Sequence, residues 1–283
     1  MRGEHENISD DNLKQLYFTI VDASNDFLPA HWHQHLEIIH LLNGQMTACI
    51  NEQSYELVPG DILVINPRDI HSTQLHGRGR YNLLQIPPVH LKRISTDWEL
   101  LHFSELLVYS DKEESLNDRL TKIFTELMRL NTGEEKGAHL LFLIQIYQLL
   151  YLLYTEDCSV VNSQSRNRTE RDFRRIVHSM EYVRKNYMSQ ITLREVAKEL
   201  SLTPEYFCRL FKKYTGQTFL AYVNQVRLQY FHQELLQTDE SITYLLNKNG
   251  ITNYKVFLRI FREAYGTTPY ELRKNVHNSE KRK

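Results

Sequence analysis

Residues 191–223 read ITLREVAKELSLTPEYFCRLFKKYTGQTFLAYV, and residues 241–273 read SITYLLNKNGITNYKVFLRIFREAYGTTPYELR. The two stretches share phenylalanine, arginine, glycine and threonine positions at an offset of fifty residues: Phe207, Arg209, Phe211, Gly216 and Thr218 recur as Phe257, Arg259, Phe261, Gly266 and Thr268. Upstream of these positions the offset is forty-nine, so the second copy has one extra residue in its turn. Because a solenoid needs at least about three stacked repeats, the pattern predicts two copies of one small helical module.

Each copy is typical of two short helices joined by a tight turn. In the first copy, a helix over Leu193–Leu200 precedes a second helix that opens at Thr203 and Pro204, which suit the N-cap and the first helical position. Apolar side chains recur along the second helix at the spacing of one buried stripe: Phe207, Leu210, Phe211 and Tyr214. The opposite face is polar and partly basic, with Glu205, Cys208, Arg209 and Lys212.

The two copies differ at the helix crossing and in the turn. Ala197 is small enough to let the helices of the first copy approach closely, whereas the second copy has Leu246 there. The second copy has Gly250 in the turn, where positive φ is free of strain for glycine, and the first has Ser201. We therefore expect a wider helix crossing in the second copy.

A helix with a buried stripe and a partly basic outer face is suited to the major groove of DNA. Ordinary helical cores have the same aromatic spacing, so one copy alone is a weak indication. Two copies with an arginine at the same outer position, Arg209 and Arg259, favour DNA binding, because each arginine can form two hydrogen bonds with a guanine.

At these positions the chain resembles the AraC/XylS family of transcription regulators. The matching residues are Leu193, Ala197, Tyr206, Arg209, Phe211, Lys212, Gly216, Tyr222, Arg227, Leu228, Ile242, Gly250, Phe257, Arg259, Phe261, Arg262, Gly266, Thr268, Pro269 and Arg273. The resemblance implies a DNA-binding domain over residues 171–277, with helix-turn-helix motifs at about 193–214 and 242–264 joined by a helix over Phe219–Gln237. It implies that bases are read by Glu205, Cys208, Arg209, Lys255, Leu258 and Arg259. Phosphate contacts, which set affinity rather than sequence, are expected from Thr203, Lys212, Lys213 and Arg262.

The charge of the chain is divided between its two halves. The net charge of the chain is −1. Residues 166–283 contain 22 Lys and Arg and 12 Asp and Glu, whereas residues 1–165 contain 12 Lys and Arg and 23 Asp and Glu. A basic half next to an acidic half indicates that only the C-terminal half contacts phosphate.

Residues 16–112 have the alternation and turns of an antiparallel β domain. The predicted strands are Tyr17–Val21, Leu36–Leu42, Gln45–Asn51, Ser54–Leu57, Asp61–Ile65 and Tyr81–Ile86, with a hairpin turn at Asn43-Gly44. Short strands with such turns are typical of a small barrel or jelly roll. This segment resembles the cupin-like sensor domain of many AraC-family regulators, on His33-Gln34-His35, Gly44, Pro59-Gly60-Asp61, Asn66-Pro67 and His71. Residues 1–15 are polar and are expected to form a loose end.

Four polar side chains of the predicted barrel stand out. His33, His35 and Glu37 share one face if they lie in a strand, and His71 is expected to join them from a later strand, while His31 and His40 fall outside this pattern. Histidines with one carboxylate also form the ligand set of metal-dependent cupins. Those cupins usually place the carboxylate further along the chain, so no metal or other cofactor is expected. Binding an organic ligand, hydrogen bonding among the histidines and a place on the rim are the other interpretations, and we expect the organic ligand.

The predicted ligand site combines aromatic surface with several hydrogen-bonding groups, as small-molecule sites do. It consists of Trp32, His33, His35, Glu37, Arg68 and His71. Carbohydrates suit this mixture, because their C–H faces stack on aromatic rings while their hydroxyls form hydrogen bonds.

Two helices are expected in residues 113–156. The first has an apolar stripe of Leu116, Leu120, Ile123, Phe124, Leu127 and Leu130. The second, Ala138–Tyr154, is apolar nearly all round and must be covered on every side. We expect it to cover the barrel and to meet a second subunit, with burial inside one chain as the alternative. Residues 157–170 are polar without a period and predict a linker, after which a helix over Asp172–Asn186 opens the DNA-binding domain.

The remaining features concern the compartment. Cys49, Cys158 and Cys208 form no CxxC pair, which fits a reducing cytoplasm; a redox sensor at Cys208 is a weak alternative for the same reason. The polar N-terminus predicts no signal peptide, and the apolar run Leu140–Tyr154 is shorter than a bilayer span. We expect a cytoplasmic, nucleoid-associated protein without a membrane partner.

Together these patterns predict an α+β chain: a cupin-like β-barrel or jelly roll with a helical dimerisation segment, followed by an all-α domain with two helix-turn-helix motifs. The predicted function is a regulator, not an enzyme, that binds promoter DNA under the control of a small molecule. It would act as a homodimer and contact RNA polymerase if it activates transcription. The alternatives are a metal-dependent cupin enzyme and a ligand-free regulator whose barrel serves only dimerisation.

Overall fold

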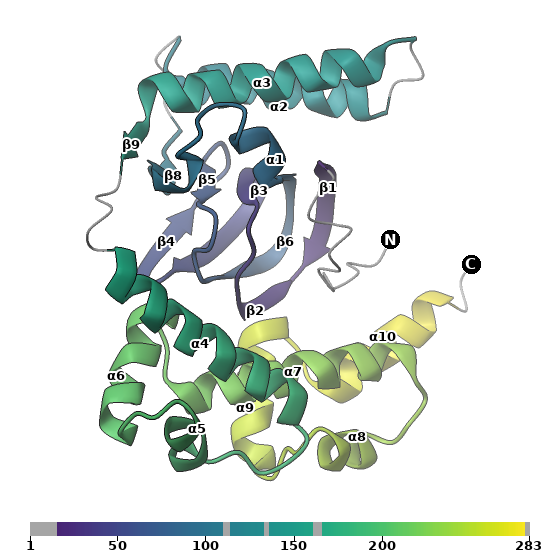
Figure 1. The fold of residues 1–283 in the computed structure, drawn as a ribbon. Coiled ribbons are helices and arrows are strands. Elements are labelled where there is room, and N and C mark those ends of the chain that lie inside the picture. The colour runs from purple at the N-terminus through teal and green to yellow at the C-terminus, as the bar shows by residue number, and fades with distance from the viewer. Residues whose placement is uncertain (1–15, 110–113, 133–135, 161–165, 281–283) are drawn as a thin grey trace.

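The computed structural model describes residues 16–109, 114–132, 136–160 and 166–280. Figure 1 shows an N-terminal sheet domain that lies between a pair of helices, α2 and α3, and a C-terminal helical domain, α4–α10. This arrangement confirms the predicted α+β fold class, with strands and helices segregated along the chain. The loose end predicted for residues 1–15 lies outside the described residues.

The sheet domain consists of one seven-stranded antiparallel sheet and a two-stranded ribbon. The large sheet has the order β1-β6-β3-β5-β8, with β2 on β6 and β4 on β3. Its strands are β1 (Tyr17–Ser24), β2 (Phe27–His31), β3 (Leu36–Ile50), β4 (Gln53–Leu57), β5 (Ile62–Ile65), β6 (His71–Ile86) and β8 (Leu106–Leu107). The ribbon pairs β7 (Leu101–Phe103) with β9 (Cys158–Val160), and the short helices are α1 (Pro88–Leu91) and a 3-10 turn (Trp98–Leu100).

The predicted hairpin turn at Asn43-Gly44 is wrong, because β3 continues through these residues as one strand of 15 residues. The pairing of β3 with β6 shifts register on both sides of Asn43, and Gly44 has φ +94°. The inward-facing apolar side chains are accordingly Ile39 and Leu41 before the shift but Met46 and Ala48 after it. The glycine does adopt the positive φ that Asn-Gly favours, but it forms a bulge, because β6, with 16 residues, pairs with both halves of β3.

Two apolar layers lie on opposite faces of these strands. On one face, Leu36, Ile38 and Val64 pack with the buried sides of α2 (Leu116–Asn131) and α3 (Ala138–Glu156). On the other face, which we call the inner face, Ile39, Leu41 and their apolar neighbours pack together. Glu37 lies between Leu36 and Ile38 and therefore points toward this second face.

The helical domain has the two predicted modules. Its helices are α4 (Arg166–Asn186), α5 (Leu193–Glu199), α6 (Pro204–Thr215), α7 (Phe219–Gln237), α8 (Ile242–Lys248), α9 (Tyr254–Tyr265) and α10 (Pro269–Glu280). Thr203 caps α6 by accepting a hydrogen bond from the backbone N–H of Tyr206, 3.3 Å away. In the two turns, Ser201 has φ +54° and Gly250 has φ +67°, as the aligned positions require.

The structure differs from the sequence analysis within residues 157–170. Cys158–Val160 forms β9, which pairs with β7, and α4 begins at Arg166 rather than Asp172. A short strand and the beginning of α4 therefore occupy part of the predicted linker. Within this stretch Glu170 belongs to α4, where its carboxylate forms ion pairs with Arg174, one turn further along the helix, and with Arg68 of the sheet domain.

Candidate DNA interface and ligand site

The first predicted reading face lies on α6. Phe207, Leu210 and Phe211 are buried and hold the helix on the domain core. On the opposite side, the three predicted base-reading side chains are exposed: Glu205, Cys208 and Arg209. The amphipathic pattern of the sequence thus decides which face of the helix is available to a partner.

The second predicted reading face lies on α9, and it is less polar. Lys255 and Arg259 are exposed, whereas Leu258 is half-buried. The guanidinium of Arg259 lies 3.9 Å from the carboxylate of Glu263, one turn further along the same face. A base would compete with this acidic neighbour for Arg259.

The residues predicted to contact phosphate lie at the ends of these helices. Lys212 and Lys213 are in the last turn of α6 and Arg262 is in the last turn of α9, all exposed. Positive charge at a helix C-terminus is also favourable within the chain, so these residues have a stabilising role besides any contact with DNA. Thr203 is exposed at the other end of α6, where its hydroxyl acts as the cap.

The helix α7 fixes the two motifs relative to each other. Arg227, near its middle, donates hydrogen bonds of 2.8 Å to the backbone carbonyls of Tyr187 and Ser189, which follow α4. The rings of Tyr187 and Tyr230 are stacked 4.1 Å apart. The turn of the second motif approaches the same segment, because a Cβ at Gly250 would lie 2.7 Å from the carbonyl oxygen of Met188.

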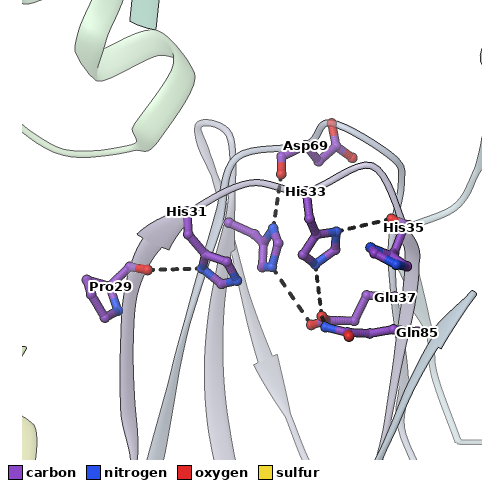
Figure 2. A network of polar contacts seen from close by, with 8 residues as sticks. Pro29, His31, His33, His35, Glu37, Asp69 and Gln85 are labelled. Atoms are coloured by element: carbon purple, nitrogen blue, oxygen red, sulfur yellow. Dashed lines mark hydrogen bonds and ion pairs between the residues drawn. The ribbon is translucent and has the colours of Figure 1, made fainter. Parts of the chain in front are cut away.

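In the sheet domain, the buried carboxylate of Glu37 organises a polar cluster at one end of the inner face (Figure 2). The Nε2 of His33 lies 2.9 Å from Oε2 of Glu37, and the amide of Gln85 donates to the same oxygen at 2.8 Å. The Nε2 of His71 lies 3.8 Å from Oε1 of Glu37. Gln85 was not among the predicted site residues, because its place opposite Glu37 follows from the pairing of β3 with β6.

The structure brings His31 into this cluster, which the sequence analysis had left outside. His31 ends β2 opposite His71 in β6, and their ring centroids are 4.1 Å apart. His35 lies on the other side of His33, whose ring centroid is 5.7 Å away (Figure 2). The prediction that His33, His35 and Glu37 share a face assumed a strand, but residues 32–35 form a bend between β2 and β3. The alternation of side chains therefore begins only at Leu36.

A backbone carbonyl holds one ring nitrogen of each clustered histidine. The Nδ1 atoms of His31, His33 and His71 lie 3.1, 3.2 and 3.0 Å from the carbonyl oxygens of Pro29, His35 and Asp69. Donation of Nδ1–H to these oxygens directs the three Nε2 atoms inward. Three ring nitrogens, one from each of these histidines, lie within 4.8 Å of one another.

Burial controls the ionisation of this cluster. Desolvation holds the pKa of His31 well below its ordinary range and lowers the pKa of His71 to about 4, so both rings are neutral at pH 7. Burial by itself would raise the pKa of the Glu37 carboxyl, but the hydrogen bond from His33 and the adjacent histidines outweigh it and hold this pKa well below its usual range. The cluster is thus a buried anion surrounded by imidazole nitrogens.

The other two predicted ligand residues, Trp32 and Arg68, lie against the helical domain instead. The ring of Trp32 meets that of Phe173 in α4 edge to face, with centroids 5.2 Å apart. The guanidinium of Arg68 lies 4.6 Å over the same Phe173 ring and forms an ion pair with Glu170. The six predicted ligand residues therefore divide into a buried histidine–carboxylate cluster and an interdomain contact.

The sheet domain and the helical domain share a continuous apolar contact next to this cluster. Ala30 and Ile70, which flank His31 and His71 in the chain, belong to the same buried group as Phe173 and Phe207. A polar contact extends it, since the amide of Gln74 donates 2.8 Å to the carbonyl of Ala264 in α9. The segments that carry His31 and His71 are therefore among those that contact the helical domain.

Comparisons with known proteins fit both halves of the chain. An AraC-like ligand binding domain matches residues 14–150, and a helix-turn-helix domain matches residues 196–275. The Msm operon regulatory protein of Streptococcus mutans is 25% identical over 253 residues, which cover 86% of this chain and 85% of that protein. The transcriptional activator RhaS of Pectobacterium carotovorum is 24% identical over 261 residues, covering 89% and 90%.

Among solved structures, ToxT of Vibrio cholerae O395 bound to (E)-4-(8-methylnaphthalen-1-yl)but-3-enoic acid has the same fold, with a TM-score of 0.50 and 11% identity over 93% of this chain and all of that one. The matched relatives are named as regulators of transcription, which excludes the metal-dependent enzyme considered from the sequence. The chain belongs to the AraC family: it is a DNA-binding transcription regulator with an N-terminal ligand-binding domain.

Proposed function

We propose that the protein reads promoter DNA with α6 and α9 in successive segments of the major groove, under the control of a ligand in the sheet domain. The observation that carries the DNA-binding part is the pair of exposed arginines, Arg209 and Arg259, at equivalent positions of two motifs held by one helix, α7. Major-groove segments on one face of DNA repeat about every 34 Å. Two recognition helices on one rigid body suit such spacing.

In this proposal the two motifs divide the contacts. Base edges are read by Glu205, Cys208 and Arg209 from α6 and by Lys255, Leu258 and Arg259 from α9. Thr203, Lys212, Lys213 and Arg262 contact phosphates, which orient the protein without reading sequence. Leu258 suits the methyl group of thymine.

A ligand controls DNA binding only if it binds two arrangements of the protein unequally. The contact of Trp32 and Arg68 with Phe173 supports such a link, because both residues are within a few positions of the buried histidines. A ligand that stacks on the ring of Trp32 would displace the ring of Phe173 from it. The effector would then release or reposition α4, and with it the first motif.

Carbohydrate is the effector class that we propose. A sugar ring stacks on Trp32 through its C–H face, while its hydroxyls hydrogen-bond to polar groups such as Arg68 and the histidines. A thermal-shift screen of the full chain with sugars tests this, because a ligand of the native state raises its melting temperature. A screen without any shift, or a shift that Trp32→Ala leaves unchanged, would contradict the proposed site.

A ligand-free regulator is the second candidate, and one observation favours it. The inner face of the sheet is filled by apolar side chains such as Ile39, Leu41 and Met46, all at most 2% exposed. A filled interior suits a domain that serves assembly rather than binding. The same screen separates the two candidates.

We also propose that the protein acts as a homodimer through α3, in the cytoplasm at the nucleoid, and contacts RNA polymerase if it activates transcription. One side of α3 is buried against the sheet domain, whereas Leu140, Ile144 and Tyr151 are 57%, 56% and 64% exposed. By length and composition alone α3 is also a candidate membrane span, of 19 residues, although the sequence analysis judged its apolar run too short. One side of α3 packs in the apolar core beneath the sheet, and in this proposal a second copy of the chain covers the exposed side. Analytical ultracentrifugation of Ile144→Glu against wild type tests this, with dissociation expected.

The DNA-binding part is tested with the full chain and the region upstream of its own gene. We expect the double variant Arg209→Ala/Arg259→Ala to lose preference for one site in this region while retaining salt-sensitive binding to unrelated DNA. Arg80→Ala, an exposed arginine of the sheet domain, is the control and should bind as wild type does. Site preference that survives in the double variant would refute the proposed reading faces.

A further inference from the structure

We propose that His31, His33, His71 and Glu37 form a binding site for one divalent first-row transition metal ion in the sheet domain. The site goes beyond the proposed function, which needs only an organic ligand. It also differs from the set weighed in the sequence analysis, because His31 replaces His35. Three imidazoles and one carboxylate are the donor set that suits zinc, iron or nickel.

The rings of His31, His33 and His71 are close enough to share one ion after the side chains move toward one another. One nitrogen from each of His31, His33 and His71 lie within 4.8 Å of one another. Tetrahedral coordination with metal–nitrogen bonds of about 2.1 Å places two ligand nitrogens about 3.4 Å apart, so the widest pair would approach by up to roughly 1.4 Å. Glu37 already faces the group, 2.9 Å from His33 and 3.8 Å from His71.

The second ring nitrogen of each histidine is held in the way that metal sites require. Histidine ligands almost always donate their other N–H to a carboxylate, a backbone carbonyl or water, which fixes the tautomer and the direction of the ring. Here Pro29, His35 and Asp69 supply three backbone carbonyls to the three Nδ1 atoms. Ordinary packing of three buried histidines does not require this common arrangement.

One nitrogen in the cluster is left without a hydrogen bond. The Nε2 of His71 is buried and has no hydrogen-bond partner, although the residue is only 1% exposed. A buried polar atom without a hydrogen-bond partner is unfavourable for the folded protein. An ion between His71 and Glu37 would satisfy this nitrogen, and at His33 it would take the place of the hydrogen that joins Nε2 to Glu37.

The position of the site connects it to the helical domain. His31 follows Ala30, which is buried with Phe173 of α4, and it precedes Trp32, whose ring meets that of Phe173. Drawing His31 toward His71 therefore moves the segment on which α4 packs. This consequence rests on the proposed function, whereas binding of the ion does not.

The test of the site uses purified full-length protein, stripped with a chelator and titrated with Zn²⁺ or Ni²⁺ in a calorimeter, with metal content measured after gel filtration. We expect one ion per chain. His71→Gln and Glu37→Gln should each weaken binding at least about tenfold, and His35→Gln should bind as wild type does. A substoichiometric wild type, or unchanged affinity in both His71→Gln and Glu37→Gln, overturns the proposal.

A matched control excludes general disruption of the strand. His40 lies in β3, like Glu37, and is buried to a similar degree, but its ring packs 5.1 Å from that of Phe124 on the other face. His40→Gln should therefore retain one ion per chain even if it lowers the melting temperature. Loss of metal in His40→Gln as severe as in His71→Gln would attribute the effect to unfolding and overturn the assignment of ligands.

The link to DNA is measured separately. Promoter affinity of the stripped protein is compared with and without Zn²⁺, and His71→Gln should abolish any difference. If the ion binds but promoter affinity does not change, the metal site stands and the link to α4 is refuted. If promoter binding itself fails, the metal titration remains valid because it contains no DNA.

Discussion

The two helix-turn-helix motifs have the same plan but different support. The first motif, α5–α6, belongs to a large buried group that includes α4 and two residues of the sheet domain, Ala30 and Ile70. The second motif, α8–α9, belongs to a smaller group with α7, and Phe27 is its contact from β2. The sheet domain thus contributes two buried residues to the apolar group of the first motif and one partly buried residue to that of the second.

The predicted reading faces of the two motifs also differ, in the surroundings of their arginines. Arg209 has polar neighbours on an exposed face, whereas Arg259 lies beside the half-buried Leu258 and 3.9 Å from Glu263. At the helix crossing, Ala197 of the first motif is fully buried and Leu246 of the second is half-buried. We therefore expect the first motif to read bases more strongly and the second to contribute more to positioning on DNA.

Exchanging the turn residues should have the largest effect. Gly250→Ala places a Cβ 2.7 Å from the carbonyl oxygen of Met188 at φ +67°, so we expect the free energy of unfolding to fall by about 2–4 kcal/mol. Ser201→Gly in the first motif removes a left-handed serine and should raise stability by at most about 1 kcal/mol. Urea unfolding followed by circular dichroism measures both. A Gly250→Ala variant as stable as wild type would show that the carbonyl of Met188 does not restrict the second turn.

Exchanging the crossing residues tests whether the second crossing is wider. Ala197→Leu adds volume to a fully buried contact and should cost about 1–3 kcal/mol. Leu246→Ala removes a half-buried side chain and should cost about 1 kcal/mol. Urea midpoints of the two variants decide the order. A larger loss in Leu246→Ala would show that the second crossing is as tightly packed as the first.

The single arginines separate the reading roles. Arg209→Ala should reduce discrimination at one guanine by about 1–3 kcal/mol, and Arg259→Ala should reduce it less, because Glu263 already competes for that side chain. Fluorescence anisotropy with a panel of singly substituted sites measures the discrimination of each variant. Removing the competitor with Glu263→Ala should raise the contribution of Arg259, and the absence of any increase would count against this explanation.

Much of the helical domain could be predicted from sequence because its signals are local. Thr203 and Pro204 begin α6, Gly216 and Gly266 end α6 and α9 with φ of +70° and +68°, and α7 spans Phe219–Gln237 as expected. Caps and glycines act within one turn of their own position. A pattern of this kind needs no knowledge of distant partners.

The histidine cluster could be predicted only in part because strand pairing creates it. His33, Glu37 and His71 were identified, but His31 joins them through its position opposite His71 across β2 and β6. The contact of Arg68 with Phe173 likewise joins residues from different domains. Asn43-Gly44 predicted a hairpin turn wrongly, because β6 pairs with β3 on both sides of these residues and the strand continues through them.

Removing phosphate contacts should give the smallest effect and the most direct test of the division between motifs. Each lost phosphate contact reduces the slope of log affinity against log salt by about 0.9. We expect Lys212→Ala and Arg262→Ala each to show this change while discrimination between DNA sequences stays as in wild type. If Arg262→Ala leaves the salt slope unchanged but relaxes sequence preference, α9 reads bases with its last turn. The second motif would then be a reader in its own right, and the difference between the two motifs would concern packing alone.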